Sequence, residues 1–188
     1  MSDDPKPRRD PLNRRFCLPR LSREHYQGDA VVHWTLTTFD RAHGWLTEEL
    51  HQRFREMMLH TAAREGLLCP VYCLMPDHLH LVWMGLRLDT DQINGMAFLR
   101  TYLEPMLVPA KFQPQAQDHV LRAEQRKRGS FAKVCFYIAA QSSAGRTGGS
   151  TGRLAIHRLR RAGVSEAASV GTGLLADVLE AIWQTAAA

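Results

Sequence analysis

The chain has 188 residues, of which 45% are hydrophobic, and this size and composition fit one globular domain with a buried core. Its formal net charge is +5, which is consistent with a polyanionic partner or simply with a basic, solvated surface. No apolar run approaches the roughly 20 residues that span a membrane, and the first residues contain no apolar signal segment, so we expect a cytoplasmic protein without a membrane anchor.

The first segment of the chain is poorly suited to regular structure. Prolines alternate with arginines over residues 1–28, a composition that resists both helix and strand. We expect this segment to be a basic, flexible arm. After it, the β-branched and aromatic residues from Ala30 to Thr38 predict a first strand.

The next segment has the signals of a helix followed by a hairpin. Thr47 is a suitable N-cap before two glutamates, apolar residues then recur at helical spacing, and Gly66 stands where a helix end favours glycine. Two apolar, strand-forming runs follow at residues 68–74 and 79–84. The short polar connection between them predicts a β-hairpin.

The second strand of this hairpin begins with two histidines at alternating positions. Because the side-chain period of a strand is two, His78 and His80 project from the same face and can hold a divalent ion. A half-exposed strand with two histidines and no metal is the plain alternative. Cys69 and Cys73 could join them in a zinc site, but their spacing spreads the thiolates along the strand, and we expect buried thiols.

Two more helices are predicted in the second half of the chain. One opens near residue 90 and ends before Pro109, and the other is capped by Ser130. A polar linker with a basic run separates them. Residues 142–188 are rich in glycine, serine, threonine and alanine, and we expect them to be poorly ordered.

One face of the last predicted helix is chemically unusual. Lys133, Tyr137 and Gln141 follow one another at intervals of four residues, so their side chains stack on one face. A cation, a phenol and an amide do not form a packing face. The face is either an ordinary exposed stripe or part of a site.

These elements and several short strings resemble the IS200-like tyrosine transposases of the HUH class, and more closely the REP-associated tyrosine transposases. The string Met-Pro-Asn-His-x-His of that family is nearly reproduced by residues 75–80. Residues 33–35 (His-Trp-Thr), 118–122 (Asp-His-Val-Leu-Arg) and 136–138 (Phe-Tyr-Ile) are similar to three further strings of the family. The resemblance covers about residues 25–141.

The resemblance implies an α+β fold, a ferredoxin-like HUH domain over residues 29–141 with an antiparallel sheet and helices packed on one face. It implies an enzyme that cleaves and rejoins single-stranded DNA through a 5'-phosphotyrosine intermediate. Hairpin-forming repeats would be the substrate, and the protein would act as a monomer or a homodimer. Two other functions stay open: a catalytically inactive DNA-binding remnant of such a transposase, and a small zinc-binding domain.

The resemblance also implies roles for individual residues. Tyr137 would be the nucleophile, and Lys133, one turn earlier, would favour its phenolate form. His78, His80 and Gln141 would bind Mg²⁺ or Mn²⁺ and leave positions open for phosphate oxygens.

The resemblance ends near Gln141. The family continues there with Asn-Pro-Val-Arg-Ala-Gly-Leu-Val and later Asp-Trp-Pro, and this chain has neither string. Codons for residues 141–155 can be chosen so that dropping the first base gives Asn-Pro-Val-Arg-Ala-Gly-Leu-Val-Glu-Ala-Pro-Glu-Asp-Trp. We therefore hypothesise that a single-base insertion near codon 141 replaced the native C-terminus, so that residues 142–188 are an out-of-frame tail. An asparagine would then be the normal third ligand.

Overall fold

A computed structural model of the chain describes residues 19–144 and 153–155. The strands are β1 (Val31–Thr37), β2 (Leu67–Leu74), β3 (His78–Gly85), β4 (Gln117–Val120) and β5 (Arg153–Ala155). The α-helices are α1 (Glu48–Glu65), α2 (Gln92–Leu103), α3 (Ala123–Lys127) and α4 (Ser130–Ala144), and the short 3-10 turns are η2 (Arg23–Tyr26), η3 (Phe39–Arg41) and η4 (Glu104–Leu107). Within this described part, no helix is both long and apolar enough to cross a membrane.

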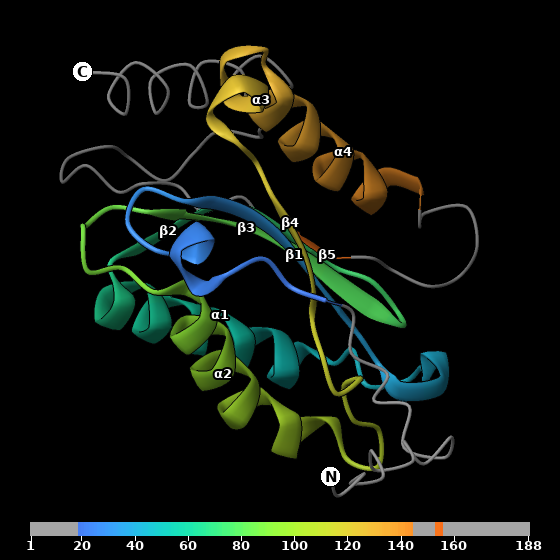
Figure 1. The fold of residues 1–188 in the computed structure, drawn as a ribbon. Helices are drawn as coiled ribbons and strands as arrows, with labels where there is room; N and C mark the ends of the chain where they lie inside the picture. The colour runs from blue at the N-terminus through green and yellow to red at the C-terminus, as the bar shows by residue number, and fades with distance from the viewer. Residues whose placement is uncertain (1–18, 145–152, 156–188) are drawn as a thin grey trace, which may run out of the picture.

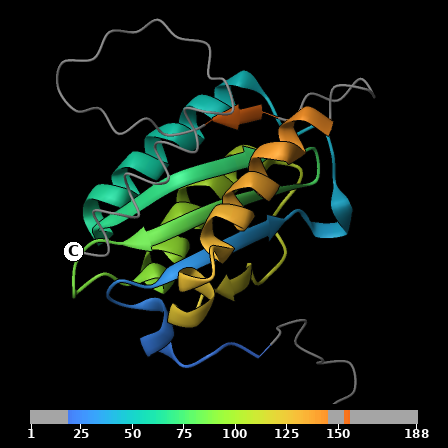
Figure 2. The same ribbon diagram turned by 90° about the horizontal axis from the view of Figure 1, so that it is seen from above.

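The strands form one antiparallel sheet in the order β4-β1-β3-β2-β5, with helices on both of its faces (Figures 1 and 2). α1 and α2 cover one face over the larger core, which contains Trp34 and Phe54. α4 covers the other face through the apolar stripe Phe131, Cys135 and Ile138. The predicted antiparallel α+β architecture is confirmed. The helices do not all lie on one face, however, because α4 carries an apolar stripe of its own.

α1 begins and ends where the sequence predicts. The Thr47 hydroxyl accepts a hydrogen bond from the Leu50 N–H at 3.1 Å. At the other end Gly66 adopts a left-handed conformation with φ 64°, and its N–H donates to the carbonyl of Ala62. Phe54 and its apolar neighbours at helical spacing are buried against the sheet.

β2 and β3 form the predicted hairpin, and β3 occupies the centre of the sheet. His80 lies opposite Thr35 of β1 on one side and opposite Cys73 of β2 on the other. Because both faces of a central strand are covered, most residues after His78 in β3 are buried, which explains its nearly continuous apolar run.

Cys69 and Cys73 do not form a zinc site with the histidines. A bulge shifts the strand register between Leu68 and Val71, and Cys69 packs in the core of α1 and α2 whereas Cys73 packs in the core of α4. Burial raises the pKa of the Cys73 thiol to about 11. Among the described residues, no group of three or more His, Cys, Asp or Glu could hold a metal ion. The predicted zinc site of Cys69, Cys73, His78 and His80 is therefore wrong, and the expected burial of both thiols is confirmed.

Residues 117–120, which the sequence assigns to a polar linker, form the edge strand β4. They pair with β1, and His119 lies opposite His33. An edge strand faces solvent along one side and can be polar, so it lacks the apolar run by which strands are recognised in a sequence.

Part of the predicted flexible arm, residues 19–28, packs against the domain, whereas residues 1–18 lie outside the described residues. Tyr26 is fully buried in the larger core, and its hydroxyl donates a 2.5 Å hydrogen bond to Asp118. Arg20 forms a 2.9 Å ion pair with the same carboxylate. Composition does not reveal this attachment because one aromatic side chain and a few polar contacts hold the segment.

Tyr26→Phe is expected to lower the free energy of unfolding by about 1–3 kcal/mol, the usual cost of removing one partner from a buried polar group. The substitution keeps the ring but takes a donor away from Asp118. Denaturant unfolding measures the loss, and Tyr102→Phe on α2 is the control because Tyr102 is 46% exposed. Equal stability of the two variants would contradict a stabilising role for this hydrogen bond.

The same pair predicts a pH effect on stability. Burial, then the hydrogen bond and charge of Asp118, raise the pKa of Tyr26 from 10.0 to about 12. The neutral phenol is the form that the fold stabilises, so its contribution is complete below pH 10 and is lost as the pH rises towards 12. Over that interval, the unfolding free energy of the unmodified chain should fall more steeply than that of Tyr26→Phe.

The sequence predicts that residues 142–188 are poorly ordered, and most of these residues lie outside the described part of the chain. Within that tail, Arg153–Ala155 form β5, which pairs with β2 at one edge of the sheet.

Candidate active site

Three histidines meet on the face of the sheet that α4 covers. β1 and β3 are neighbours, and their antiparallel register puts Thr35 opposite His80. Side chains at alternate positions of the two strands therefore share this face. The ring of His80 lies between those of His33 and His78, with centroid distances of 5.1 and 4.7 Å.

Each histidine of the predicted ligand pair has a partner at its Nδ1 atom. Asp77 Oδ1 lies 2.6 Å from Nδ1 of His78. Nδ1 of His80 lies 2.9 Å from the Thr35 hydroxyl and 3.1 Å from Nε2 of His33. A proton held at Nδ1 leaves the lone pair on Nε2, and the Nε2 atoms of His78 and His80 face each other 3.1 Å apart.

This geometry fits one divalent cation. Two metal–nitrogen bonds of about 2.1 Å at right angles hold the nitrogens about 3 Å apart, close to the separation of the two Nε2 atoms. Burial, and then the charges of His33 and His78, lower the pKa of His80 to about 3. His80 is therefore neutral near pH 7, which is the form that binds metal.

The Asp77 carboxylate contacts both His78 and Arg41, which lies in the turn η3 after β1. Its second oxygen accepts a 2.9 Å hydrogen bond from Arg41, whose backbone lies in the left-handed region with φ 54°. Burial acts to raise the pKa of Asp77, but hydrogen bonds with His78 and Arg41 outweigh burial, and the pKa lies below its ordinary value. The carboxylate is thus ionised beside His78 and can orient that imidazole.

α4 places Tyr137 beside the imidazoles. Its ring is 5.9 Å from that of His80 in an edge-on arrangement, and its side chain is 52% exposed, so a substrate can reach it. Lys133 is exposed one turn before it, and Gln141 is partly buried one turn after it. The structure thus brings together Tyr137, His78 and His80. No hydrogen bond or ion pair within the described residues joins Lys133 or Gln141 to the two histidines.

The sequence assigns no separate role to His33 or Thr35. Their spacing of two residues on β1 indicates that the two side chains share a face of the strand. Only the pairing of β1 with β3 shows that this face carries His80. Burial, and then the charge of His119, lower the pKa of His33 to about 4. A neutral imidazole and a hydroxyl therefore flank Nδ1 of His80.

The fold is similar to that of a solved structure described as the structure of the REP associates tyrosine transposase bound to a REP hairpin. The match has a TM-score of 0.54 and 16% sequence identity, and it covers 70% of this chain and 75% of that chain. No family model matches the chain, and no curated protein matches its sequence. At this identity the similarity establishes a shared fold, and the fold class expected from the sequence is confirmed.

Proposed function

We propose that the protein cleaves and rejoins single-stranded DNA through Tyr137, with His78 and His80 binding Mg²⁺ or Mn²⁺ beside it. The observation that carries the proposal is the meeting of two metal-competent imidazoles and an accessible phenol on one face of the sheet. Similarity to a transposase fold supports DNA as the substrate. Hairpin-forming repeats are the substrate class that we propose, with the protein acting as a monomer or a homodimer.

Phosphoryl transfer needs a nucleophile in line with the leaving oxygen and positive charge on the phosphate. A divalent cation held by His78 and His80 would supply that charge. The Tyr137 hydroxyl oxygen attacks the phosphorus, the bond to the 3'-oxygen breaks, and a free 3'-hydroxyl leaves while the 5'-phosphate stays on the tyrosine. Attack by a 3'-hydroxyl on this phosphotyrosine reverses the step and rejoins the DNA.

Two other residues of α4 complete the proposed site. Lys133 would favour the phenolate of Tyr137 by its charge, because an ordinary tyrosine has a pKa near 10. Gln141 would provide an amide oxygen as the third metal ligand.

A catalytically inactive DNA-binding protein is the second candidate function. It is favoured by Gln141, which makes no hydrogen bond to the histidines among the described residues and precedes the segment that departs from the family strings. Incubation with Mn²⁺ and labelled hairpin DNA, followed by a denaturing gel, separates the two functions. A covalent adduct supports the enzyme, and binding without an adduct supports the inactive remnant.

The out-of-frame origin of residues 142–188 is part of the proposed domain organisation, after the basic arm 1–28 and the domain 29–141. Sequencing the gene across codons 141–155 tests this origin directly. The hypothesis requires codons that yield Asn-Pro-Val-Arg-Ala-Gly-Leu-Val after the loss of one base. Codons incompatible with that string would disprove the hypothesis of a single-base insertion.

Thr35→Val is expected to weaken Mn²⁺ binding about tenfold, since partners of a metal-bound histidine are typically worth 10–100-fold in affinity. The substitution removes the hydroxyl that lies 2.9 Å from Nδ1 of His80. Titration of Mn²⁺ followed by electron paramagnetic resonance measures the affinity, with the exposed Thr101→Val on α2 as the control. Equal affinity of the two variants would show that Thr35 does not orient the ligand.

A further inference from the structure

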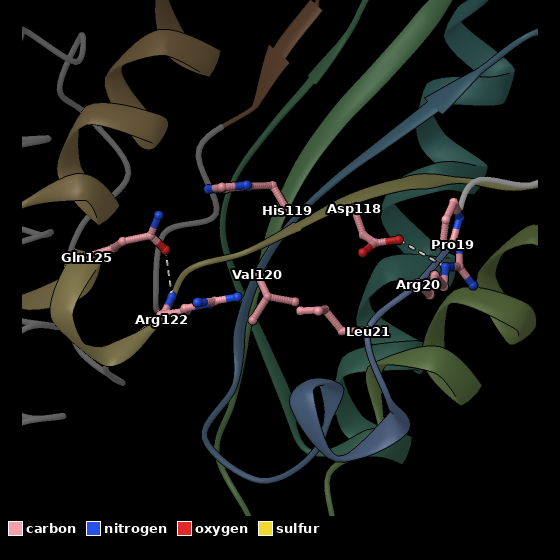
Figure 3. Close-up of a pocket in the computed structure, with 8 residues that line it drawn as sticks. All are labelled: Pro19, Arg20, Leu21, Asp118, His119, Val120, Arg122 and Gln125. Carbon is pink, nitrogen blue, oxygen red and sulfur yellow. Dashed lines mark hydrogen bonds and ion pairs between the residues drawn. The ribbon is translucent and has the colours of Figure 1, made fainter.

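A pocket of about 440 Å³ opens along the outer edge of β4 (Figure 3). Such a volume is typical of sites for small ligands. The N-terminal segment around Leu21 forms one wall, β4 forms the base, and the start of α3, with Gln125, forms the opposite wall. None of these residues belongs to the proposed active site.

The pocket carries a positive charge that is not neutralised within the described part of the chain. Arg20 and Asp118 form an ion pair at 2.9 Å, so their charges cancel. Arg122 is exposed, and its guanidinium forms no ion pair with any described residue. Its backbone N–H donates to Gln125 at 2.9 Å, which holds the residue at the start of α3. The Arg122 guanidinium therefore favours a ligand with an anionic group at this wall of the pocket.

The base of the pocket offers backbone hydrogen-bonding groups. The Leu121 N–H donates to the carbonyl of Val31 on β1, and by the antiparallel alternation His119 also bonds to β1. The N–H and C=O groups of the alternate residues Asp118 and Val120 consequently point away from β1, towards the outer edge of the sheet. Within the described residues these outward groups make no further backbone hydrogen bond. Outward donors and acceptors of this kind can bind the edge of a nucleobase.

The pocket adjoins the proposed active site. His119 lines the pocket and lies opposite His33, whose Nε2 is 3.1 Å from Nδ1 of His80. β4 and β3 are separated by β1 alone, which places them about 10 Å apart. That distance equals about three stacked nucleotides at roughly 3.4 Å each.

We propose that this pocket holds one unpaired nucleotide of the DNA strand, within about three nucleotides of the phosphate that Tyr137 attacks. The inference rests on the proposed function and adds a subsite to it. Arg122 binds the phosphate of that nucleotide, the base packs against the exposed Leu21 and the partly buried Val120, and its edge meets the outward groups of β4. A peptide strand fits less well, because the two walls leave an edge shorter than a usual strand.

Fluorescence anisotropy of labelled single-stranded DNA, in EDTA and over a range of salt concentrations, tests the subsite without any cleavage. Arg122→Gln is expected to weaken binding roughly fivefold and to reduce the slope of log affinity against log salt by about 0.7, the value for one lost phosphate contact. Lys127→Gln is the matched control, since Lys127 lies outside the pocket, on the helix that Arg122 precedes, and pairs with Glu124. Arg122→Lys keeps the charge and should keep the slope, which separates a lost contact from a damaged fold.

The outcomes distinguish the subsite from the function on which it rests. If the unmodified chain binds no single-stranded DNA, both proposals fail. If it binds DNA and the affinity and salt slope of Arg122→Gln equal those of Lys127→Gln, only the nucleotide subsite is overturned. A peptide would then be the better candidate ligand for the pocket. A single abasic position within about three nucleotides of the cleaved bond should also weaken binding. Affinity unchanged by every such position would overturn the placement of the base.

Discussion

Tyr137→Phe is expected to form no covalent adduct with hairpin DNA in Mn²⁺, under conditions in which the unmodified chain forms one that survives a denaturing gel. Phenylalanine keeps the aromatic ring beside His80 but removes the oxygen that would attack the phosphate. Loss of the nucleophile in a covalent enzyme can lower the rate roughly 10⁶-fold, far below what a gel detects. Noncovalent DNA binding should be nearly unchanged, because the removed hydroxyl acts in the chemical step.

Tyr102→Phe is the matched control for this experiment. Tyr102 is also about half exposed, but it lies on α2, across the sheet from the histidines. Its variant should form the adduct at the rate of the unmodified chain. An adduct of normal yield from Tyr137→Phe would show that another side chain is the nucleophile.

His78→Ala is expected to reduce the affinity for Mn²⁺ by at least about 10²-fold, more than the loss of a residue that only orients a ligand. It removes one of the two Nε2 atoms that face each other 3.1 Å apart. Since His78 is only partly buried at the start of β3, the fold should persist, and circular dichroism with thermal unfolding checks this. Adduct formation should fall together with metal binding.

His60→Ala controls for the general effect of removing an imidazole. His60 is exposed on α1, on the opposite side of the sheet from the proposed site. Its variant should bind Mn²⁺ with unchanged affinity. If His78→Ala also binds Mn²⁺ normally, the histidine pair is not the metal site, and the proposed role of the cation must be abandoned.

Local signals in the sequence predict the parts of the fold that depend on neighbouring residues. The N-cap Thr47 and the C-terminal Gly66 bound α1 because capping involves groups within one helical turn. The period of two in β3 likewise places His78 and His80 on one face before any strand pairing is known. The chemistry of the site is therefore visible early, as two imidazoles and a separate tyrosine.

The rest depends on contacts between distant segments. His33 and Thr35 acquire a role only when β1 pairs with β3, some 45 residues later in the chain. The burial of Tyr26 depends on Asp118, which lies in a strand too short and polar to predict from its sequence. The sequence could not predict that α4 lies on the opposite face of the sheet from α1 and α2. An apolar stripe indicates that a helix packs against a sheet, but it does not indicate which face the helix covers.

The most direct measurement is identification of the residue that carries the DNA. The unmodified chain is incubated with hairpin DNA and Mn²⁺, the adduct is isolated under denaturing conditions and digested with protease and nuclease, and tandem mass spectrometry locates the attached nucleotide. The proposed function predicts a 5'-phosphate ester on the Tyr137 hydroxyl. A nucleotide on any other side chain, or no linked peptide from a protein that binds both DNA and Mn²⁺, would contradict it.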